Sequence, residues 1–319
     1  MSAIDKKALS RLLADAPSNW GKWGSEDEVG ALNYLTDEEI KLGVAAIRWS
    51  RPFALGAPIA TATGDPVFPG RWAARHYMVA DKAGFEAGRW RPLRGGLEFA
   101  DDYVSSFAQA GTHCDALGHM WFDDTLWNGY PAASTNGGMT KASIEPIARR
   151  GIVGRAVLLD LARFRGKTFL QRAETFDHRD LLECARSQAV EIKPRSILML
   201  RTGWLGALER GEARIDETYW EPGLTFSLEL VCWFAQMEIP CFLTDTLANE
   251  TTYEPNSGVM LVLHAALMRN LGVVFTEMAW LDELATACAE DSQYDGLYAA
   301  SPLQVSRGTG GGLNPIFIK

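Results

Sequence analysis

Two histidines and an aspartate lie close together in the sequence and could hold a metal ion. They are His113, Asp115 and His119, in the segment Gly-Thr-His-Cys-Asp-Ala-Leu-Gly-His. In an extended strand, residues i and i+2 point to the same side, so His113 and Asp115 can reach one ion. A turn at Gly118 would return His119 to the same pocket. Nitrogen and oxygen ligands suit zinc or manganese, but the spacing is also compatible with a hydrogen-bonded loop that holds no metal.

The neighbours of this cluster have simpler expected roles. Gly111 permits a close backbone approach or unusual backbone angles. Thr112 has a hydroxyl that can orient a neighbouring ligand. Cys114 would face away from His113 and Asp115 in a strand, so we expect it to pack in the core rather than act as a nucleophile.

Two residues far along the chain also have the chemistry of metal ligands. His264 lies in an apolar segment, residues 259–267, and by itself this setting indicates a core histidine with a satisfied hydrogen bond. Glu277 follows the apolar run 273–276, which predicts a buried strand. At the end of that strand, its carboxylate either faces a site or is solvated.

Four aromatic residues could form a wall for a planar substrate. Trp121, Phe122 and Tyr130 follow the histidine cluster closely, and Trp23 lies in a Trp/Gly-rich segment near the N-terminus. Large aromatic side chains also contribute much of the packing in ordinary cores. The sequence leaves both roles open for each of them.

The elements that must position these side chains alternate between strands and helices. Thr36 is a good helix N-cap, and Glu39 would complete a capping box. Short apolar runs alternating with helices predict an α/β protein. The predicted strands cover residues 155–161, 196–201, 241–244, 273–276 and 315–318, and the predicted helices cover 2–13, 36–47, 180–189, 227–237, 260–270 and 282–288.

Other segments show less regular patterns. Residues 52–98 are rich in Gly, Pro and Arg, which predicts irregular strands and loops, and residues 308–312 predict a flexible turn. No Pro/Ser linker divides the chain. We therefore expect a single domain over residues 1–319, with an N-terminal extension of about residues 1–35.

The composition is that of an ordinary globular protein, with 47% hydrophobic and 22% charged residues. A formal net charge of −9 argues against nucleic acid as a partner. No apolar stretch has the length needed to cross a bilayer, and the polar N-terminus contains no signal-peptide core. The five cysteines are scattered without a CxxC pair, which favours a reducing compartment. We expect a cytoplasmic protein that binds neither nucleic acid nor membrane.

The segment Gln109–His119 resembles the signature of the cyclase-like metal hydrolases, a family that includes bacterial kynurenine formamidases and isatin hydrolases. The usual pattern is H-x-G-T-H-x-D-x-x-x-H. The resemblance extends from about Trp23 to Ile318. It implies a cyclase-like α/β fold of the swivelling β/β/α type, with a central mixed or barrel-like sheet and peripheral helices. Supporting segments are Trp23–Asn33, Asn128–Tyr130, Leu200–Trp204 and Asn314–Ile316.

The resemblance also implies a role for each residue that matches the pattern. His113 and Asp115 would be metal ligands, joined by His264 and Glu277, which match the family's later histidine and glutamate. His119 would be the general acid/base. This changes the expectation for His264 from a core histidine to a ligand.

One position departs from the pattern. The family's first histidine falls at Gln109, whose neutral oxygen is a weaker ligand. The departure favours one divalent ion over two, Mn²⁺ or Zn²⁺, with Gln109 as a further ligand or a substrate contact.

The resemblance implies a metal-dependent hydrolase that cleaves an amide, lactam or lactone bond of a small cyclic or aromatic substrate. It also implies a homodimer or homotetramer. Two other functions are compatible with the same residues: a lyase, dehydratase or cyclase that uses the same metal site, and a non-catalytic protein that binds a metal or a small molecule.

Overall fold

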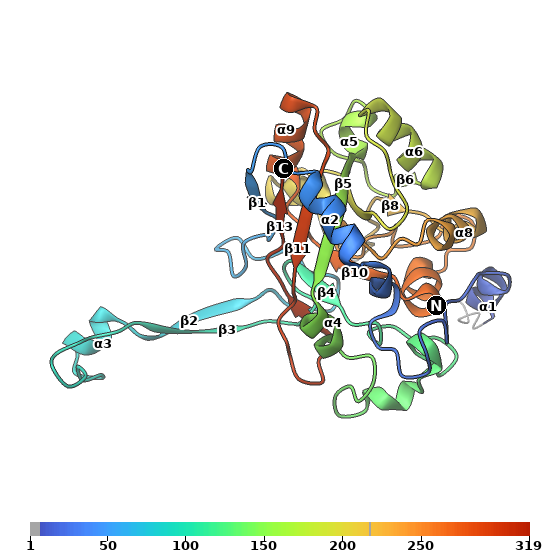
Figure 1. The fold of residues 1–319 in the computed structure, drawn as a ribbon. Coiled ribbons are helices and arrows are strands. Elements are labelled where there is room, and N and C mark those ends of the chain that lie inside the picture. Colours follow the sequence, from blue (N-terminus) through green and yellow to red (C-terminus); the bar gives the residue numbers. More distant parts are fainter. Residues whose placement is uncertain (1–6, 217) are drawn as a thin grey trace.

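The computed structural model describes residues 7–216 and 218–319, and within them nine strands form one mixed sheet (Figure 1). The order is β1-β13-β11-β5-β7-β9-β10-β4-β12. The four strands β5, β7, β9 and β10 are parallel neighbours, and the flanking pairs are antiparallel. The strands are β1 (Pro52–Ala54), β4 (His113–Asp115), β5 (Ile152–Asp160), β7 (Ile197–Arg201), β9 (Cys241–Thr244), β10 (Val274–Glu277), β11 (Asp295–Ala300), β12 (Gly310–Gly312) and β13 (Ile316–Ile318).

Helices surround this sheet, so the predicted α/β class with a central mixed sheet and peripheral helices is confirmed. Among the helices of the described residues, none is long and apolar enough to cross a bilayer. The division into one domain with an N-terminal extension stays a prediction. The helices are α1 (Ala8–Leu13), α2 (Asp37–Ala45), α3 (Lys82–Glu86), α4 (Ile144–Arg150), α5 (Leu161–Phe164), α6 (His178–Ser187), α7 (Trp204–Glu209), α8 (Leu228–Gln236), the π-helix η4 (His264–Arg269) and α9 (Asp282–Asp291).

The parallel centre of the sheet forms where the sequence has near-continuous apolar runs. Every residue of β9 is buried, and so is β5 apart from Val153. A strand that is covered on both faces has apolar residues on both sides, without the apolar–polar alternation of a half-exposed strand. These segments therefore have the sequence pattern of short apolar runs.

The predicted helices form close to their expected bounds. At α2, the Thr36 hydroxyl and the Glu39 carboxylate complete the expected capping box. Residues 2–6 of the first predicted helix lie outside the described residues. The predicted helix 260–270 becomes the π-helix η4 from His264, and such wide turns are frequent at functional sites.

The glycine-rich segment at the C-terminal end corrects one expectation. Residues 308–312 do not form a simple flexible turn, because Gly310–Gly312 is strand β12 and pairs with β4. A Cβ on Gly310 would lie 2.6 Å from Gln109 Nε2 and 3.0 Å from the Cys114 carbonyl oxygen. Glycine therefore permits the close approach of the Gly310 backbone to Gln109 and Cys114. A strand made of glycines has no side-chain pattern from which it could be predicted.

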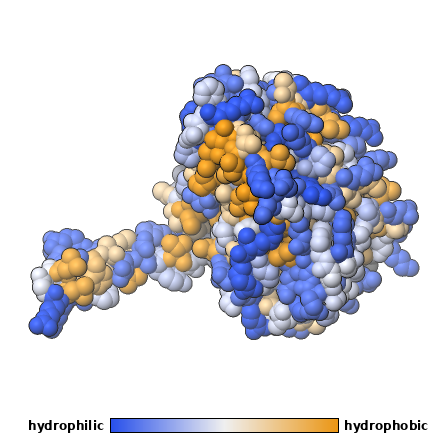
Figure 2. All heavy atoms as spheres, viewed as in Figure 1, coloured by the Kyte–Doolittle hydropathy of each residue, from blue (hydrophilic) through white to orange (hydrophobic). Residues whose placement is uncertain are grey.

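Residues 72–108 form an arm that projects far from the body of the molecule (Figures 1 and 2). Its shaft is an antiparallel hairpin of β2 (Arg75–Ala80) and β3 (Asp101–Ser105), and α3 lies toward its tip. The strands are almost entirely exposed. The composition of residues 52–98 pointed to irregular structure here, but it did not indicate a separate projecting element.

Candidate metal centre

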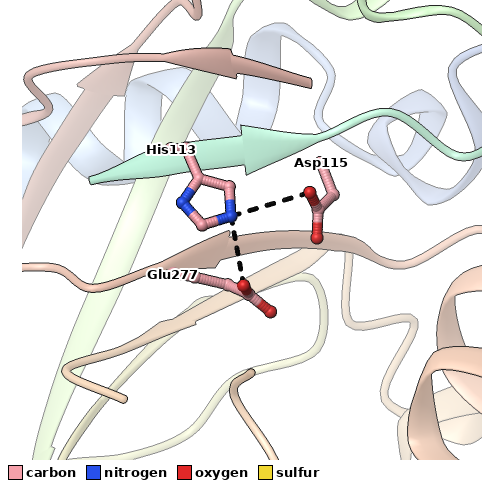
Figure 3. Close-up of side chains that lie close together, drawn as sticks. All are labelled: His113, Asp115 and Glu277. Atoms are coloured by element: carbon pink, nitrogen blue, oxygen red, sulfur yellow. Dashed lines mark ion pairs between the residues drawn. The ribbon is translucent and has the colours of Figure 1, made fainter. Parts of the chain in front are cut away.

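Strand β4 and the end of β10 bring three predicted ligands together. In the antiparallel pairing of these strands, Glu277 lies directly opposite His113. His113 Nε2 is 3.1 Å from Glu277 Oε2 and 3.7 Å from Asp115 Oδ1 (Figure 3). One ligand atom from each of the three buried residues lies within 4.8 Å of the other two. The i, i+2 geometry of a strand supplies His113 and Asp115, and the register supplies Glu277.

The protonation of His113 shows why this cluster needs a positive charge. Its Nδ1 is 2.9 Å from the Gly111 carbonyl oxygen, which can only accept, so Nδ1 carries the proton. When the ring is neutral, Nε2 therefore carries a lone pair that faces the carboxylates of Glu277 and Asp115. Burial alone would lower the pKa of His113, but Glu277 and Asp115 raise it overall.

Within the described part of the chain, four buried atoms of the cluster have no hydrogen-bond partner: His113 Nε2, both carboxylate oxygens of Asp115, and Glu277 Oε1. Buried carboxylates are costly unless they are paired or bind a metal. The donor set of imidazole nitrogen and carboxylate oxygens suits Zn²⁺ or Mn²⁺. The residues therefore fit a divalent ion.

His264 reaches the same cluster from η4. Its Nε2 is 3.6 Å from Glu277 Oε1, and its Nδ1 is 2.6 Å from Glu250 Oε1. Glu250 also accepts hydrogen bonds from the backbone N–H groups of Leu263 and His264. Burial by itself would lower the pKa of His264, but Glu250 and Glu277 raise it to about 10. Glu250 thus holds the ring so that Nε2 faces Glu277.

Sequence reasoning missed Glu250. It precedes His264 by 14 residues and no motif connects the two. A carboxylate that orients a metal-binding histidine is common around metal centres, but only the folded loop shows which carboxylate it is.

Replacing Glu250 with glutamine is expected to weaken metal binding by about 10–100-fold, the usual effect of losing such a partner. The glutamine side chain has one acceptor oxygen in place of the carboxylate, so it cannot satisfy all three donors. Titration calorimetry with Zn²⁺ and Mn²⁺ measures the change. Glu254→Gln is the matched control, because Glu254 is also buried but caps the local turn at Asn256 and Ser257. Equal metal affinity in Glu250→Gln and the wild type would contradict this role.

His119 lies beside the cluster rather than within it. It lines a cavity of about 50 Å³ together with His264, Glu277, Phe68 and Arg71. Burial lowers the pKa of His119 and outweighs the opposing effect of Asp115. Its imidazole is therefore neutral near pH 7 and can accept a proton. Neither Phe68 nor Arg71 was singled out from the sequence, where no motif marks them.

The residues next to His113 fix the position of the cluster by hydrogen bonds and packing. Thr112 Oγ1 donates to the Met278 carbonyl oxygen at 2.6 Å and accepts from the Ala57 N–H at 2.8 Å. It therefore holds the backbone next to Glu277 rather than a ligand side chain. Gly111 has φ +61°, and a Cβ there would lie 2.5 Å from Ile59 Cγ2. Cys114 is fully buried in the core, and burial raises its pKa well above the ordinary value, which fits the packing role.

Gln109 lies on the β12 side of β4. Its side-chain Nε2 donates to Thr309 Oγ1 at 3.0 Å, and its main-chain carbonyl oxygen accepts from Arg71 Nη1 at 3.0 Å. These contacts place the side chain against Thr309 and Gly310. Its role as a metal ligand stays a prediction.

The four aromatic residues do not gather around the cavity. Trp23 packs on Tyr34, with ring centroids 5.0 Å apart. Tyr130 is buried, and its hydroxyl donates to the Ser25 carbonyl oxygen. Trp121 is 51% exposed, and Phe122 is partly buried near Arg269. A substrate contact by any of them stays a prediction.

Comparisons with known proteins agree with this architecture. Residues 50–251 match the family model described as putative cyclase. A solved structure described as a novel cyclase is 33% identical, with a TM-score of 0.84 over 95% of this chain and 98% of that chain. None of the curated proteins matches this chain.

More distant solved structures share the fold. Isatin hydrolase A from Labrenzia aggregata, bound to benzyl benzoate, is 20% identical, with a TM-score of 0.55 over 86% of this chain and 94% of that chain. Isatin hydrolase A from Ralstonia solanacearum is 18% identical, with a TM-score of 0.59 over 84% and 92%. At these identities the likeness concerns the fold alone.

Proposed function

Because this chain belongs to the putative cyclase family, we propose that it is a metal-dependent hydrolase. Its substrate would be a small cyclic or aromatic compound with an amide, lactam or lactone bond. The observation that carries the proposal is the cluster of His113, Asp115 and Glu277, whose buried polar atoms lack partners and lie beside a neutral histidine. The isatin hydrolases of similar fold support the choice of a cyclic amide.

The ligands would be His113, Asp115, Glu277 and His264, with Gln109 as a further candidate. A divalent ion held there would polarise a carbonyl group and make water acidic enough to react near neutral pH. The set contains two imidazoles and two carboxylates, which suits Mn²⁺ or Zn²⁺. We favour one ion, because the position of a further histidine ligand is occupied by Gln109.

Other residues of the chain would transfer the proton, stabilise the developing charge and exclude water. His119 would take the proton from the attacking water and pass it to the leaving nitrogen or oxygen. Arg71 lines the same cavity with a permanent positive charge, which would stabilise the oxyanion that develops on the carbonyl. Phe68 and Leu261 would limit the access of bulk water.

The test is a screen of amides, lactams and lactones with protein loaded with Zn²⁺ or Mn²⁺, run in ¹⁸O-labelled water. Hydrolysis incorporates one labelled oxygen into the product, whereas a lyase, dehydratase or cyclase reaction does not. Metal binding without turnover of any compound in the screen would favour a non-catalytic binding protein. Metal-free protein is the control and should be inactive.

A further inference from the structure

A second cavity, at the carboxyl ends of β5 and β7, is lined mainly by charged side chains. Its volume is about 520 Å³, within the ~300–1,000 Å³ of small-molecule sites. It shares no lining residue with the cavity beside His119, so the two cavities are separate. Five of its seven lining residues are charged: Arg163, Lys167, Arg201, Arg210 and Glu212.

Two parallel strands and the segments that follow them position these side chains. Asp160 ends β5 and Arg201 ends β7, and the strand register places the two residues side by side. Arg163 lies in α5, directly after β5, and Lys167 lies in the loop that follows. Arg210 lies at the end of α7, which begins just after β7. In α/β sheets, ligands commonly bind in the crevice at the carboxyl ends of the strands.

The lining of this cavity is positive, although the chain as a whole is acidic. Four positive charges and one negative charge line it, a formal sum of +3, whereas the whole chain carries −9. Each cation pairs with a carboxylate, but of these carboxylates only Glu212 lines the cavity. The others are Asp160, Glu174 and Asp282. They hold the cations in place from outside the cavity, so the lining keeps its positive potential.

Arg201 forms a fixed part of the cavity wall. Its Nε donates to Asp282 Oδ1 at 2.7 Å, and its Nη1 donates to Asp160 Oδ1 at 2.8 Å. Its Nη2 donates to the Thr168 carbonyl oxygen at 3.3 Å. Burial by itself would lower the pKa of Arg201, but the surrounding carboxylates, Asp160 first among them, raise it overall. The guanidinium therefore contributes a permanent positive charge.

The other three cations keep N–H groups that a ligand can use. Neither Nη atom of Arg163 donates a hydrogen bond to another described residue. Lys167 Nζ donates to Glu174 Oε2 at 2.7 Å, which leaves two N–H groups of the ammonium. Arg210 Nη2 donates to Glu212 Oε2 at 2.9 Å, while its Nη1 makes no hydrogen bond within the described residues.

We propose that this cavity binds a small anion that carries a phosphoryl group. The free donors of Arg163, Lys167 and Arg210 come from three different segments. A phosphoryl group has three or more oxygens in a tetrahedral arrangement and can accept from several directions, whereas a planar carboxylate has only two oxygens. Arginine and lysine are both common partners of phosphate.

The lining also limits the rest of the ligand. Among the described residues that form it, none has an aromatic or aliphatic side chain. A nucleobase or an acyl chain would therefore have no surface on which to stack or pack. Inorganic phosphate or a compact phosphorylated metabolite fits this lining.

Titration calorimetry of the full-length, metal-loaded chain with inorganic phosphate tests the site. Arg163→Ala/Lys167→Ala should weaken phosphate binding at least ~10-fold, because it removes two sets of charge-assisted donors. Circular dichroism checks that the variant folds. Wild-type affinity in this variant, or no phosphate binding by the wild type at millimolar concentration, would overturn the proposal.

Arg149→Ala/Lys41→Ala is the matched control, because it removes the same charge elsewhere on the surface. The side chain of Arg149 is 59% exposed and that of Arg163 is 57% exposed, and each forms one ion pair. Lys41, like Lys167, pairs with one glutamate. Arg149 lies on α4, far from α5 (Figure 1). The control should bind phosphate as the wild type does, and an equal loss in both double variants would show a non-specific effect of net charge and refute the site.

Glu212→Gln should change the affinity in the opposite direction. It removes the carboxylate that lines the cavity and keeps the shape of the side chain, so phosphate should bind about 2–5-fold more tightly. Glu209→Gln is its control, because Glu209 lines a different cavity and the change should leave phosphate binding unaltered. Unchanged or weaker binding in Glu212→Gln would contradict the proposed position of the anion.

Two further titrations distinguish this site from other anion sites. Phosphate bound to the metal ion would be lost in Asp115→Ala and retained in Arg163→Ala/Lys167→Ala, and that result would refute the proposal. Malonate, a dianion without a phosphoryl group, should bind the wild type at least ~10-fold more weakly than phosphate. Equal affinity for malonate would overturn the assignment of a phosphoryl group. None of these measurements depends on turnover, so they leave the hydrolase function to its own test.

Discussion

A chain with Asp115→Ala is expected to fold normally and to lose its bound divalent metal. Both Asp115 oxygens are buried without a hydrogen-bond partner, and Oδ1 is 3.7 Å from His113 Nε2. Since this carboxylate makes no hydrogen bond within the described part of the chain, its removal should affect the ion far more than the fold. Losing an orienting partner already costs about 10–100-fold in affinity, so loss of a ligand should cost at least ~100-fold. Elemental analysis after dialysis, with circular dichroism to confirm folding, measures both.

Cys114→Ala is the matched control for this prediction. Cys114 is the neighbouring residue on the same strand, but its side chain packs in the core. The control should retain metal at the wild-type level. An unchanged metal content in Asp115→Ala would remove Asp115 from the ligand set, and loss of metal in both variants would point to damage to β4 instead.

Replacing His119 with alanine should have the opposite combination of effects: metal is retained and turnover is lost. His119 lines the cavity beside Glu277 and His264, and burial keeps its imidazole neutral. Removal of a general acid/base typically costs about 10²–10⁴-fold in rate. We therefore expect kcat/KM to fall by this factor on whichever substrate the screen identifies, with wild-type metal content by elemental analysis.

His178→Ala provides a histidine control away from the centre. His178 begins α6 and stacks on Trp233, so its loss should leave turnover unchanged. Normal kcat/KM in metal-loaded His119→Ala would exclude His119 as the acid/base. Loss of metal from this variant would instead make His119 a ligand.

Local patterns predicted much of the scaffold. The apolar runs at 155–161 and 241–244 predicted buried strands, and Thr36 with Glu39 predicted the start of α2. These signals succeed because backbone conformation over a few residues depends on caps and side-chain periodicity. The same local patterns failed for Gly310–Gly312, because glycine has no side chain with which to show a strand's periodicity.

The sequence by itself determined the pair His113 and Asp115, since residues two positions apart in a strand have their side chains on the same side. It also determined the α/β class. Only the tertiary structure decided that Glu277 lies opposite His113, that Glu250 orients His264, and that residues 72–108 leave the body as an arm. These features depend on strand register and on contacts between distant segments, and such contacts are set by the packing of the whole chain rather than by neighbouring residues.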